Sequence, residues 1–523
     1  MDLPALRAAA EAQCLAAKGP PGLALALAYA DGSVRSACVG HARLGDTEAV
    51  TPQTWFRLGS ISKVVTALAV LHRLLGAGDD PDRPLGPSAF GADPRRAPDS
   101  VTPAALLCHV AGLPDGAALG TPALGDATSW LACARPFGRR FSYSNLGYAL
   151  LGAWLQEQVG GSETWLRQHA LEPFGLRNIA FAPPPGARRA AGHVLDPAAG
   201  ALAPFELAFT DDRLGPAGFL WATADGLGSL ATALLSPPDE LCRGVVERLT
   251  TPGSEAFGAG GLRMGHGLFL LDRGGRRIGF HDGEIGGFRS LLQLDLAAGH
   301  ATCVLSNLSG PEHGPRDLLA AAARKGDVKS AVKPVPPAAP EAAPAGTRLR
   351  CYLSAGAGLL ELEERTPPRH GRWNGAPLAL APREPGILGG VGATGPLQLR
   401  LPEPKGAAGD RLPDHLHLNG QLFRACALRS NRTRRFDPAW QGRYDNGYWI
   451  EVKVAPDGRV VVASTLTGFA EEALALGARS LACSFGLLVF RLAAGRRWLR
   501  ALALNGFAGP PTAAGGDDAP ASP

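Results

Sequence analysis

Lysine is scarce in this chain. Only seven of its 52 Lys and Arg residues are lysines, at positions 18, 63, 325, 329, 333, 405 and 453. A lysine inside an apolar helical run, as at Lys63, therefore calls for a chemical reason.

Other absences exclude whole classes of function. The net charge is only +5, and no basic run contains interleaved aromatics, so nucleic-acid binding is not indicated. No uncharged apolar stretch is long enough to cross a bilayer, and the first residues lack the pattern of a signal peptide. The nine cysteines are an odd number without metal-ligand spacing. We expect a cytoplasmic protein with reduced, mostly buried thiols and no metal or cofactor.

The length of 523 residues corresponds to roughly two to four domains, and 46% hydrophobic residues indicate a globular chain. The clearest boundary is the Pro- and Ala-rich stretch 325–346, which predicts an extended linker. The predicted division is a first domain at 1–328, a linker at 329–345, β-domains at 346–428 and 429–508, and a disordered tail at 509–523.

The first domain is predicted to be α+β. Two strands joined at Asp31-Gly32 are expected within 22–40, and a helix in the later part of 55–75, ending at Gly76 and Gly78. Strands at both ends of the domain and helices between them favour one antiparallel sheet flanked by helices. The further helices are expected near 103–110, 145–159, 163–170 and 224–235, and the further strands near 266–272, 276–281, 288–295 and 300–306.

Beyond the linker, short apolar runs are separated by Gly and Pro, which is typical of antiparallel β structure. Runs such as LRCYL, LLELEE, LQLRL and QLFRACAL occupy the first stretch, and WIEVKV, RVVVAS, LLVFRL and LRALAL the second. We interpret them as two small antiparallel β-barrels.

The segment Ser60-Ile61-Ser62-Lys63 is an SxxK motif at the start of a predicted helix. Residues three apart share a helical face, so the Lys63 amine can reach the Ser60 hydroxyl. A serine is a weak nucleophile unless a base takes its proton, and a lysine does so only when it is neutral. The alternative is that Ser60 caps the helix and Lys63 lies at the surface, which is the more common situation for an isolated SxxK.

Tyr143-Ser144-Asn145 is a YxN motif ahead of the predicted helix at 145–159. A tyrosine hydroxyl beside a lysine can relay a proton, and Asn145 can bind an amide. The alternative is a core tyrosine beside an asparagine N-cap.

His281-Asp282-Gly283 is an HxG motif on a predicted strand. The small Gly283 would let a substrate backbone lie against the strand edge. The following N–H, from Glu284, would form an oxyanion hole with the N–H of Ser60. The alternative is that His281 is structural.

Taken in this order, SxxK, YxN and HxG resemble the three signatures of the serine β-lactamase and penicillin-binding superfamily. LLCHVAGLPDG (106–116) and PAGFLWATADGLGSL (216–230) are similar to further segments of that superfamily. The HxG variant resembles the class C-like branch of esterases, DD-peptidases and aminopeptidases.

A closer resemblance is to bacterial D-stereospecific aminopeptidases, over nearly the whole chain. In that family a loop of the last barrel reaches the active-site mouth and carries an aspartate near the substrate amine. The matching stretch here is 464–477, with Leu474 at the matched position and Glu471 and Glu472 nearby. The amine-binding role therefore stays open, and a solvated helical turn is the alternative for the two glutamates.

The resemblance implies acyl transfer without a cofactor. Ser60 would attack an amide or ester, Lys63 would accept its proton, Tyr143 would deliver it to the leaving group, and His281 would shape the field at the strand edge. Small D-aminoacyl peptides, amides or esters are the expected substrates, β-lactams covalent inhibitors, and a homodimer the expected assembly. The alternatives are an esterase, β-lactamase or DD-peptidase on this scaffold, and a non-catalytic binding protein.

Overall fold

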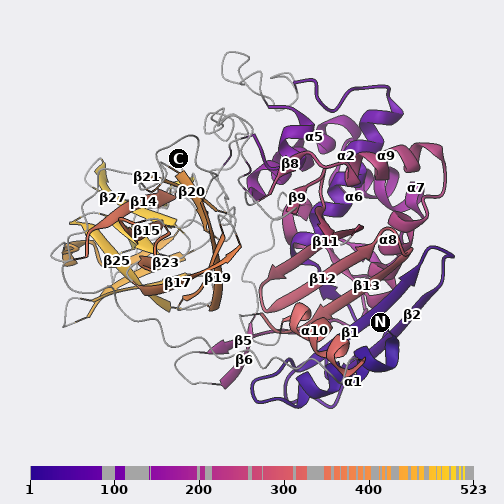
Figure 1. Cartoon of the computed structure of the whole chain (residues 1–523), viewed down its shortest axis with the longest axis horizontal. Coiled ribbons are helices and arrows are strands. Elements are labelled where there is room, and N and C mark those ends of the chain that lie inside the picture. Colours follow the sequence, from indigo (N-terminus) through magenta and orange to yellow (C-terminus); the bar gives the residue numbers. More distant parts are fainter. Residues whose placement is uncertain are drawn as a thin grey trace.

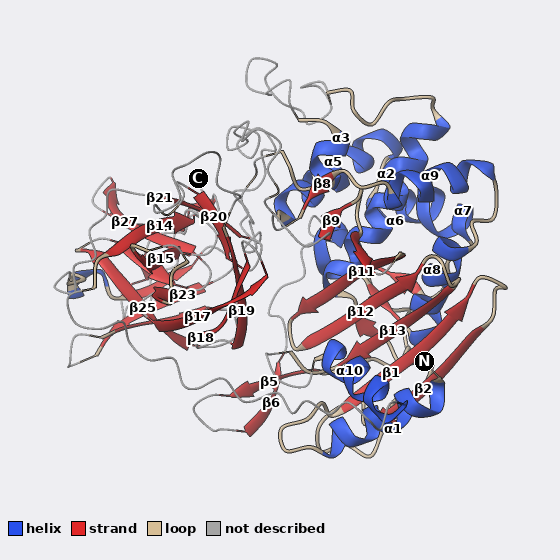
Figure 2. Ribbon diagram, in the orientation of Figure 1, coloured by secondary structure: helices blue, strands red, loops and turns tan. Residues whose placement is uncertain are grey.

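A computed structural model of the chain is shown in Figures 1 and 2. It describes most of residues 2–326 and most of 347–512. The described residues are 2–84, 101–111, 113, 141, 143–196, 201–205, 215–256, 262–273, 275–309, 314–326 and, between short gaps, 347–512.

Eight antiparallel strands form the sheet of the N-terminal region (Figure 2). β1 (Gly22–Tyr29) pairs on one side with β2 (Val34–Gly40) and on the other with β13 (His300–Ser306), from the far end of this region. The expectation that strands from both ends build one antiparallel sheet is confirmed. Its other strands are β12 (Phe288–Asp295), β11 (Arg276–Ile285), β10 (Phe269–Arg273), β9 (Leu262–Met264) and β8 (Ser254–Glu255).

Both faces of this sheet are covered, which explains the sequence GLALALAY of β1. Its leucines share a core with α1 (Leu3–Leu15) and α10 (Pro315–Gly326), which lie against one face. Its alanines belong to the larger core on the other face, where α8 (Ala224–Leu235) packs. The period of two along the strand thus sorts large and small side chains between two helical layers.

Helix α2 (Ser62–Gly76) lies within the larger layer, and every residue from Ser62 to Leu71 is buried. It is preceded by the single 3₁₀ turn η1 (Gly59–Ile61). The neighbouring helical elements are α3 (Pro103–Leu107), α5 (Asn145–Val159), α6 (Ser162–Leu166), η4 (Arg167–Leu171), α7 (Glu172–Phe174), η6 (Gly215–Phe219) and α9 (Glu240–Thr250).

Two small sheets complete this region. β3 (Phe56–Arg57) and β4 (Ile179–Ala180) both pair with β7 (Trp221–Ala222), and β5 (Gly192–Asp196) pairs with β6 (Ala201–Phe205).

Most helices and strands expected here are confirmed, including α5, α8, β12 and β13 at the expected bounds. The helix expected at 103–110 ends at Leu107, and the strand expected at 276–281 extends to Ile285. The sequence did not predict α1, α9 or α10.

The C-terminal residues form two groups of β-strands. Eight strands close into a barrel, and nine others form a sheet whose order runs from β29 to β30. β15 of the barrel packs against β26 and β27 of the sheet. Barrel strands are β14 (Leu349–Ser354), β15 (Gly358–Glu363), β16 (His370–Trp373), β17 (Ala376–Glu384), β18 (Ile387–Gly392), β19 (Gly395–Arg400), β20 (His415–Leu418) and β21 (Gln421–Ala425). Sheet strands are β22 (Gly442–Asp445), β23 (Trp449–Val454), β24 (Val460–Ser464), β25 (Ala470–Gly477), β26 (Ser480–Cys483), β27 (Gly486–Ala493), β28 (Arg496–Ala501), β29 (Gly506–Phe507) and β30 (Pro511–Thr512), with the 3₁₀ turn η7 (Pro438–Trp440) before β22.

The division into domains stays a prediction. The linker 329–345 lies outside the described residues. The short strand β30 pairs with β22, which differs from the disordered tail expected at 509–523. Within the described residues, the free thiols are Cys14, Cys38, Cys108, Cys242, Cys303 and Cys351.

Gly152 permits α5 to approach η6. A Cβ at Gly152 would lie 2.0 Å from Cγ of Pro216, whereas a Cβ at Gly244 in α9 would meet nothing within 4 Å. We expect Gly152→Ala to lower the free energy of unfolding by about 1–3 kcal/mol, because a rigid proline ring cannot move aside. The matched helix variant Gly244→Ala should raise it by about 0.4–1 kcal/mol. Urea unfolding measures both, and equal effects would contradict this packing.

Candidate active site

Ser60 lies in η1, at the entrance to α2. The turn is anchored by the N–H of Leu58, which donates to the carbonyl of Leu220 at 2.8 Å. Gly59 has a φ of +53°, and a Cβ there would lie 2.5 Å from the nitrogen of Glu284. Glycine is therefore required at this position, and its small size lets the turn place Ser60 directly beside β11.

Lys63 occupies the centre of this arrangement. Its side chain has an exposed fraction of 0%. Its Nζ lies 3.0 Å from Oγ of Ser60, 2.5 Å from Oδ1 of Asn145 and 2.5 Å from the carbonyl oxygen of Ala217 in η6. The expected contact of Ser60 with Lys63 is thus present, and Lys63 is not a surface residue.

The three contacts restrict how the Lys63 nitrogen can be used. The oxygens of Asn145 and Ala217 only accept hydrogen bonds, so each of them fixes one N–H of Lys63. Ser60 lies at another position around the nitrogen. In the neutral amine a lone pair at that position can take the hydroxyl proton of Ser60.

The YxN motif is positioned by the start of α5. The hydroxyl of Ser144 caps the helix by accepting from the N–H of Gly147 at 3.0 Å, so Ser144 and not Asn145 is the N-cap. Asn145, the first residue of the helix, is thereby directed to Lys63. The ring of Tyr143 lies beside the same amine, with its centroid 5.0 Å from Nζ of Lys63. The proton-relay role of Tyr143 stays a prediction.

His281 is buried next to these groups. Its Nδ1 donates to the carbonyl of Asp282 at 2.7 Å, and its ring centroid lies 6.4 Å from that of Tyr143. Burial, and secondarily the charge of Lys63, lower the pKa of His281 to about 3. The imidazole is therefore neutral at physiological pH, with the unprotonated Nε2 facing the interior.

His109 is a neighbour of the motifs that the sequence did not single out. Its ring stacks near Tyr143 with centroids 4.4 Å apart, and its Nδ1 accepts the N–H of Ser144 at 3.0 Å. Burial and the nearby charge of Lys63 hold the pKa of His109 well below its ordinary value. The only sequence signal was its place in the segment 106–116. His109 also has a φ of +56°, a conformation that non-glycine residues adopt rarely.

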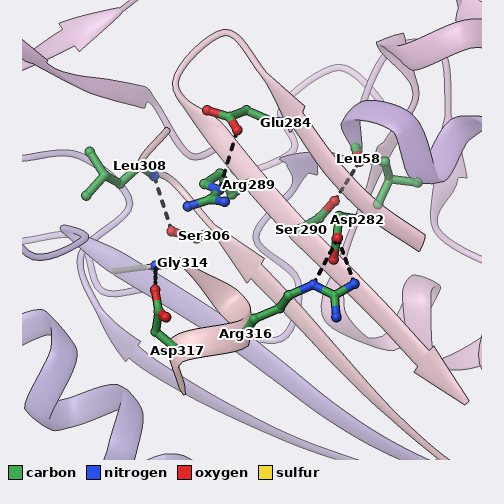
Figure 3. A network of polar contacts seen from close by, with 10 residues as sticks. All are labelled: Leu58, Asp282, Glu284, Arg289, Ser290, Ser306, Leu308, Gly314, Arg316 and Asp317. Carbon is green, nitrogen blue, oxygen red and sulfur yellow. Dashed lines mark hydrogen bonds and ion pairs between the residues drawn. The ribbon is translucent and has the colours of Figure 1, made fainter. Parts of the chain in front are cut away.

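Gly283 has a packing role that the sequence did not predict. A Cβ there would lie 2.0 Å from the carbonyl oxygen of Leu58 and 2.2 Å from Oγ of Ser290. The hydroxyl of Ser290 donates to the carbonyl of Leu58 at 2.6 Å (Figure 3). The absent side chain thus makes room for the backbone that leads to Ser60, and its role toward a substrate stays a prediction.

Figure 3 shows two ion pairs that fix the outer side chains of β11. Asp282 binds Arg316 of α10 at 2.8 Å, and Glu284 lies 3.6 Å from Arg289 of β12. The alternation along the strand explains this, because His281 lies on the opposite face from its two acidic neighbours. The role expected of Glu284 depends on its backbone nitrogen, which lies beside Gly59.

The structure does not bring Glu471, Glu472 and Leu474 together with Ser60. They belong to β25, which pairs with β24, so the helical turn considered for the glutamates is wrong. Figure 1 draws β25 in the left-hand group of strands, apart from α2 and β11. Residues 465–469 of the expected loop lie outside the described residues.

Comparison with known proteins gives the family. The family model described as beta-lactamase matches residues 7–325. The chain belongs to the beta-lactamase family. It is 30% identical over 323 residues to penicillin-binding protein 4 of Amycolatopsis lactamdurans, covering 55% of this chain and 81% of that protein. The resemblance to the serine β-lactamase and penicillin-binding superfamily, a superfamily of serine hydrolases, is confirmed.

Solved structures share the fold of this beta-lactamase family member. SurE matches with a TM-score of 0.60 and 25% identity, over 81% of this chain and 98% of SurE. The structure of SurE with D-Leu matches with a TM-score of 0.58 and 24% identity, over 81% of this chain and 99% of that protein. The octameric penicillin-binding protein homologue from Pyrococcus abyssi matches with a TM-score of 0.55 and 20% identity, over 81% of this chain and 100% of that protein.

Within the described part of the chain, no helix combines the length and apolarity that crossing a membrane requires. The same residues contain no group of three His, Cys, Asp or Glu side chains arranged to hold a metal ion.

The low pKa of His281 predicts how stability depends on pH. Between its ordinary value of 6.5 and about 3, the unfolded chain binds a proton that the folded protein excludes. The free energy of unfolding should therefore fall as the pH is lowered through this window. Between pH 7 and 4.5, we expect the free energy of unfolding of His281→Gln to fall by about 2–3 kcal/mol less than that of the wild type.

Urea unfolding at the two pH values provides the measurement. His109 and His266 have pKa values lowered in the same direction, and they remain in both proteins. An equal loss of stability in wild type and His281→Gln would show that His281 is not held neutral by its site.

Proposed function

We propose that this protein is a serine hydrolase that forms an acyl-enzyme at Ser60 and that its substrates carry an N-terminal D-amino acid. The observation that carries the proposal is the 3.0 Å contact between Nζ of Lys63 and Oγ of Ser60, in a site where the lysine is fully buried. A base within reach of a partly exposed hydroxyl is the requirement for nucleophilic catalysis.

In the proposed acylation, Oγ of Ser60 attacks the carbonyl carbon while its proton passes to Nζ of Lys63. Collapse of the tetrahedral intermediate breaks the bond to the leaving group, which takes a proton from the Lys63–Tyr143 pair. Water then adds to the ester, and the same groups accept and return its proton. The products are the free acid and the amine or alcohol.

The developing oxyanion would be bound by the N–H groups of Ser60 and Glu284. The close packing of Gly59 against the nitrogen of Glu284 supports this assignment, because it brings the two backbones to the same place.

The proposed D-specificity rests on the resemblance to D-stereospecific aminopeptidases. The fold likeness to SurE with D-Leu agrees with it. The residue that would bind the substrate amine is unassigned, because Glu471 and Glu472 lie on β25. We propose further that the C-terminal strands form accessory β-domains, since the fold likeness to SurE covers 81% of this chain and so extends beyond residues 7–325.

A substrate panel tests the activity. We expect release of p-nitroaniline from D-alanine p-nitroanilide at least about tenfold faster than from the L-isomer, because a chiral site places only one isomer in line with Ser60. Nitrocefin should acylate the enzyme and turn over slowly. Hydrolysis confined to p-nitrophenyl acetate would remove the aminopeptidase assignment, and rapid nitrocefin turnover would favour a β-lactamase.

Two serine variants serve as matched controls. Ser60→Ala should lower kcat by about a thousandfold or more and abolish labelling by a fluorophosphonate. Ser62→Ala should keep both, because the Ser62 hydroxyl accepts the N–H of Leu220 at 3.1 Å inside the core. An unlabelled wild-type protein would indicate a non-catalytic binding protein.

A further inference from the structure

A buried arginine lies three residues before Ser60. Arg57 is on β3, paired in register with Trp221 of β7. Its side chain is 8% exposed. The guanidinium carbon lies 4.5 Å from the ring centroid of Trp221 and 5.6 Å from that of Phe219. The two rings therefore flank the cation.

Nothing in the described part of the chain neutralises this cation. No acidic side chain there forms an ion pair with Arg57, and no hydrogen bond to its guanidinium is present. Burial and the charge of Arg189 lower the pKa of Arg57 to about 10, so it stays charged at neutral pH. A buried charge without a counter-ion costs several kcal/mol, which calls for a compensating function.

The flanking rings do not supply the missing partner. They interact with the faces of the guanidinium, whereas its five N–H donors lie in the plane. Although the Arg57 nitrogens have no hydrogen-bond partner within the described residues, they are not completely shut off from solvent. The N–H edge is therefore open to a ligand.

Arg189 is a second cation at the same place. It is exposed, and its backbone forms a parallel bridge with Trp55, the residue directly before β3. It too has no acidic partner within the described residues, whereas the adjacent Arg188 is paired with Glu48. Two unneutralised guanidiniums on neighbouring segments form a local positive site.

Short backbone stretches connect this positive site to the proposed catalytic groups. Three residues span at most about 11 Å, so Arg57 is within that distance of Ser60 along the backbone. On the other side, Gly192 packs on the turn that follows β11, where a Cβ would lie 2.3 Å from the carbonyl oxygen of Gly286. Arg189, three residues before Gly192, is thereby held near the end of the strand that carries Glu284.

We propose that Arg57 and Arg189 bind a carboxylate of the substrate while its scissile carbonyl lies at Ser60. A guanidinium fork matches the two oxygens of a carboxylate, and the rings of Trp221 and Phe219 hold its plane. This inference rests on the proposed hydrolase function. It makes short peptides with a free C-terminal carboxylate better substrates than their amides.

Kinetics with D-alanylglycine and D-alanylglycinamide test the proposal, because the two differ only in the carboxylate. The wild type should have a kcat/KM about tenfold or more higher for the acid. Arg189→Ala should lose this preference, so that the acid and the amide are hydrolysed with similar kcat/KM. Arg188→Ala removes the same charge one residue away, and it should behave as the wild type.

Binding to the Ser60→Ala protein separates the carboxylate site from catalysis. Calorimetric titration with N-acetylglycine should show binding that N-acetylglycinamide lacks and that Arg189→Ala or Arg57→Met weakens about tenfold or more. Circular dichroism melting checks that Arg57→Met folds. Absent turnover with intact N-acetylglycine binding would overturn the hydrolase assignment alone. Equal binding of acid and amide, or binding unaffected by Arg189→Ala, would overturn the carboxylate site.

Discussion

The contact between the buried Lys63 nitrogen and the Ser60 hydroxyl depends on three separate parts of the chain. η1 and the first turn of α2 bring Ser60 and Lys63 together, α5 contributes the amide oxygen of Asn145, and η6 contributes the carbonyl of Ala217. Two of these partners only accept hydrogen bonds, so each of them fixes an N–H of Lys63, while the nucleophile lies in a further direction around the nitrogen. Removing any of these elements would leave a buried polar group unsatisfied, so the fold and the chemistry stabilise the same geometry.

Glycines allow the backbones of these elements to approach one another closely. Gly59 and Gly283 let η1 lie against β11, and Gly152 lets α5 lie against η6. In each case a Cβ would fall within 2.5 Å of another residue, so the backbone itself is the packing surface. The rings of His109 and His281 both lie beside that of Tyr143, which in turn lies beside the fully buried Lys63.

The sequence predicts the family, the sheet and the contact of Ser60 with Lys63, because side-chain spacing on a helix determines which groups meet. It assigns Asn145 to a substrate amide and does not predict that the Asn145 oxygen contacts Lys63. It does not predict the carbonyl of Ala217, since any residue type provides a backbone oxygen. His109 is missed because an isolated histidine has no spacing to read. Glu471 and Glu472 sit in AEEALALG, whose composition favours a helix, but pairing with β24 makes it a strand. Whether Arg57 has a counter-ion is likewise a property of the fold alone.

The rate of Ser60 acylation in Lys63→Met tests the central claim most directly, with Lys18→Met as the control at a lysine outside the site. The account predicts that stopped-flow acylation by D-alanine p-nitroanilide falls by about a thousandfold or more, with an unchanged circular dichroism spectrum and a normal Lys18→Met protein. Acylation within a few-fold of the wild type would contradict it, because Ser60 would then be activated without the amine beside it.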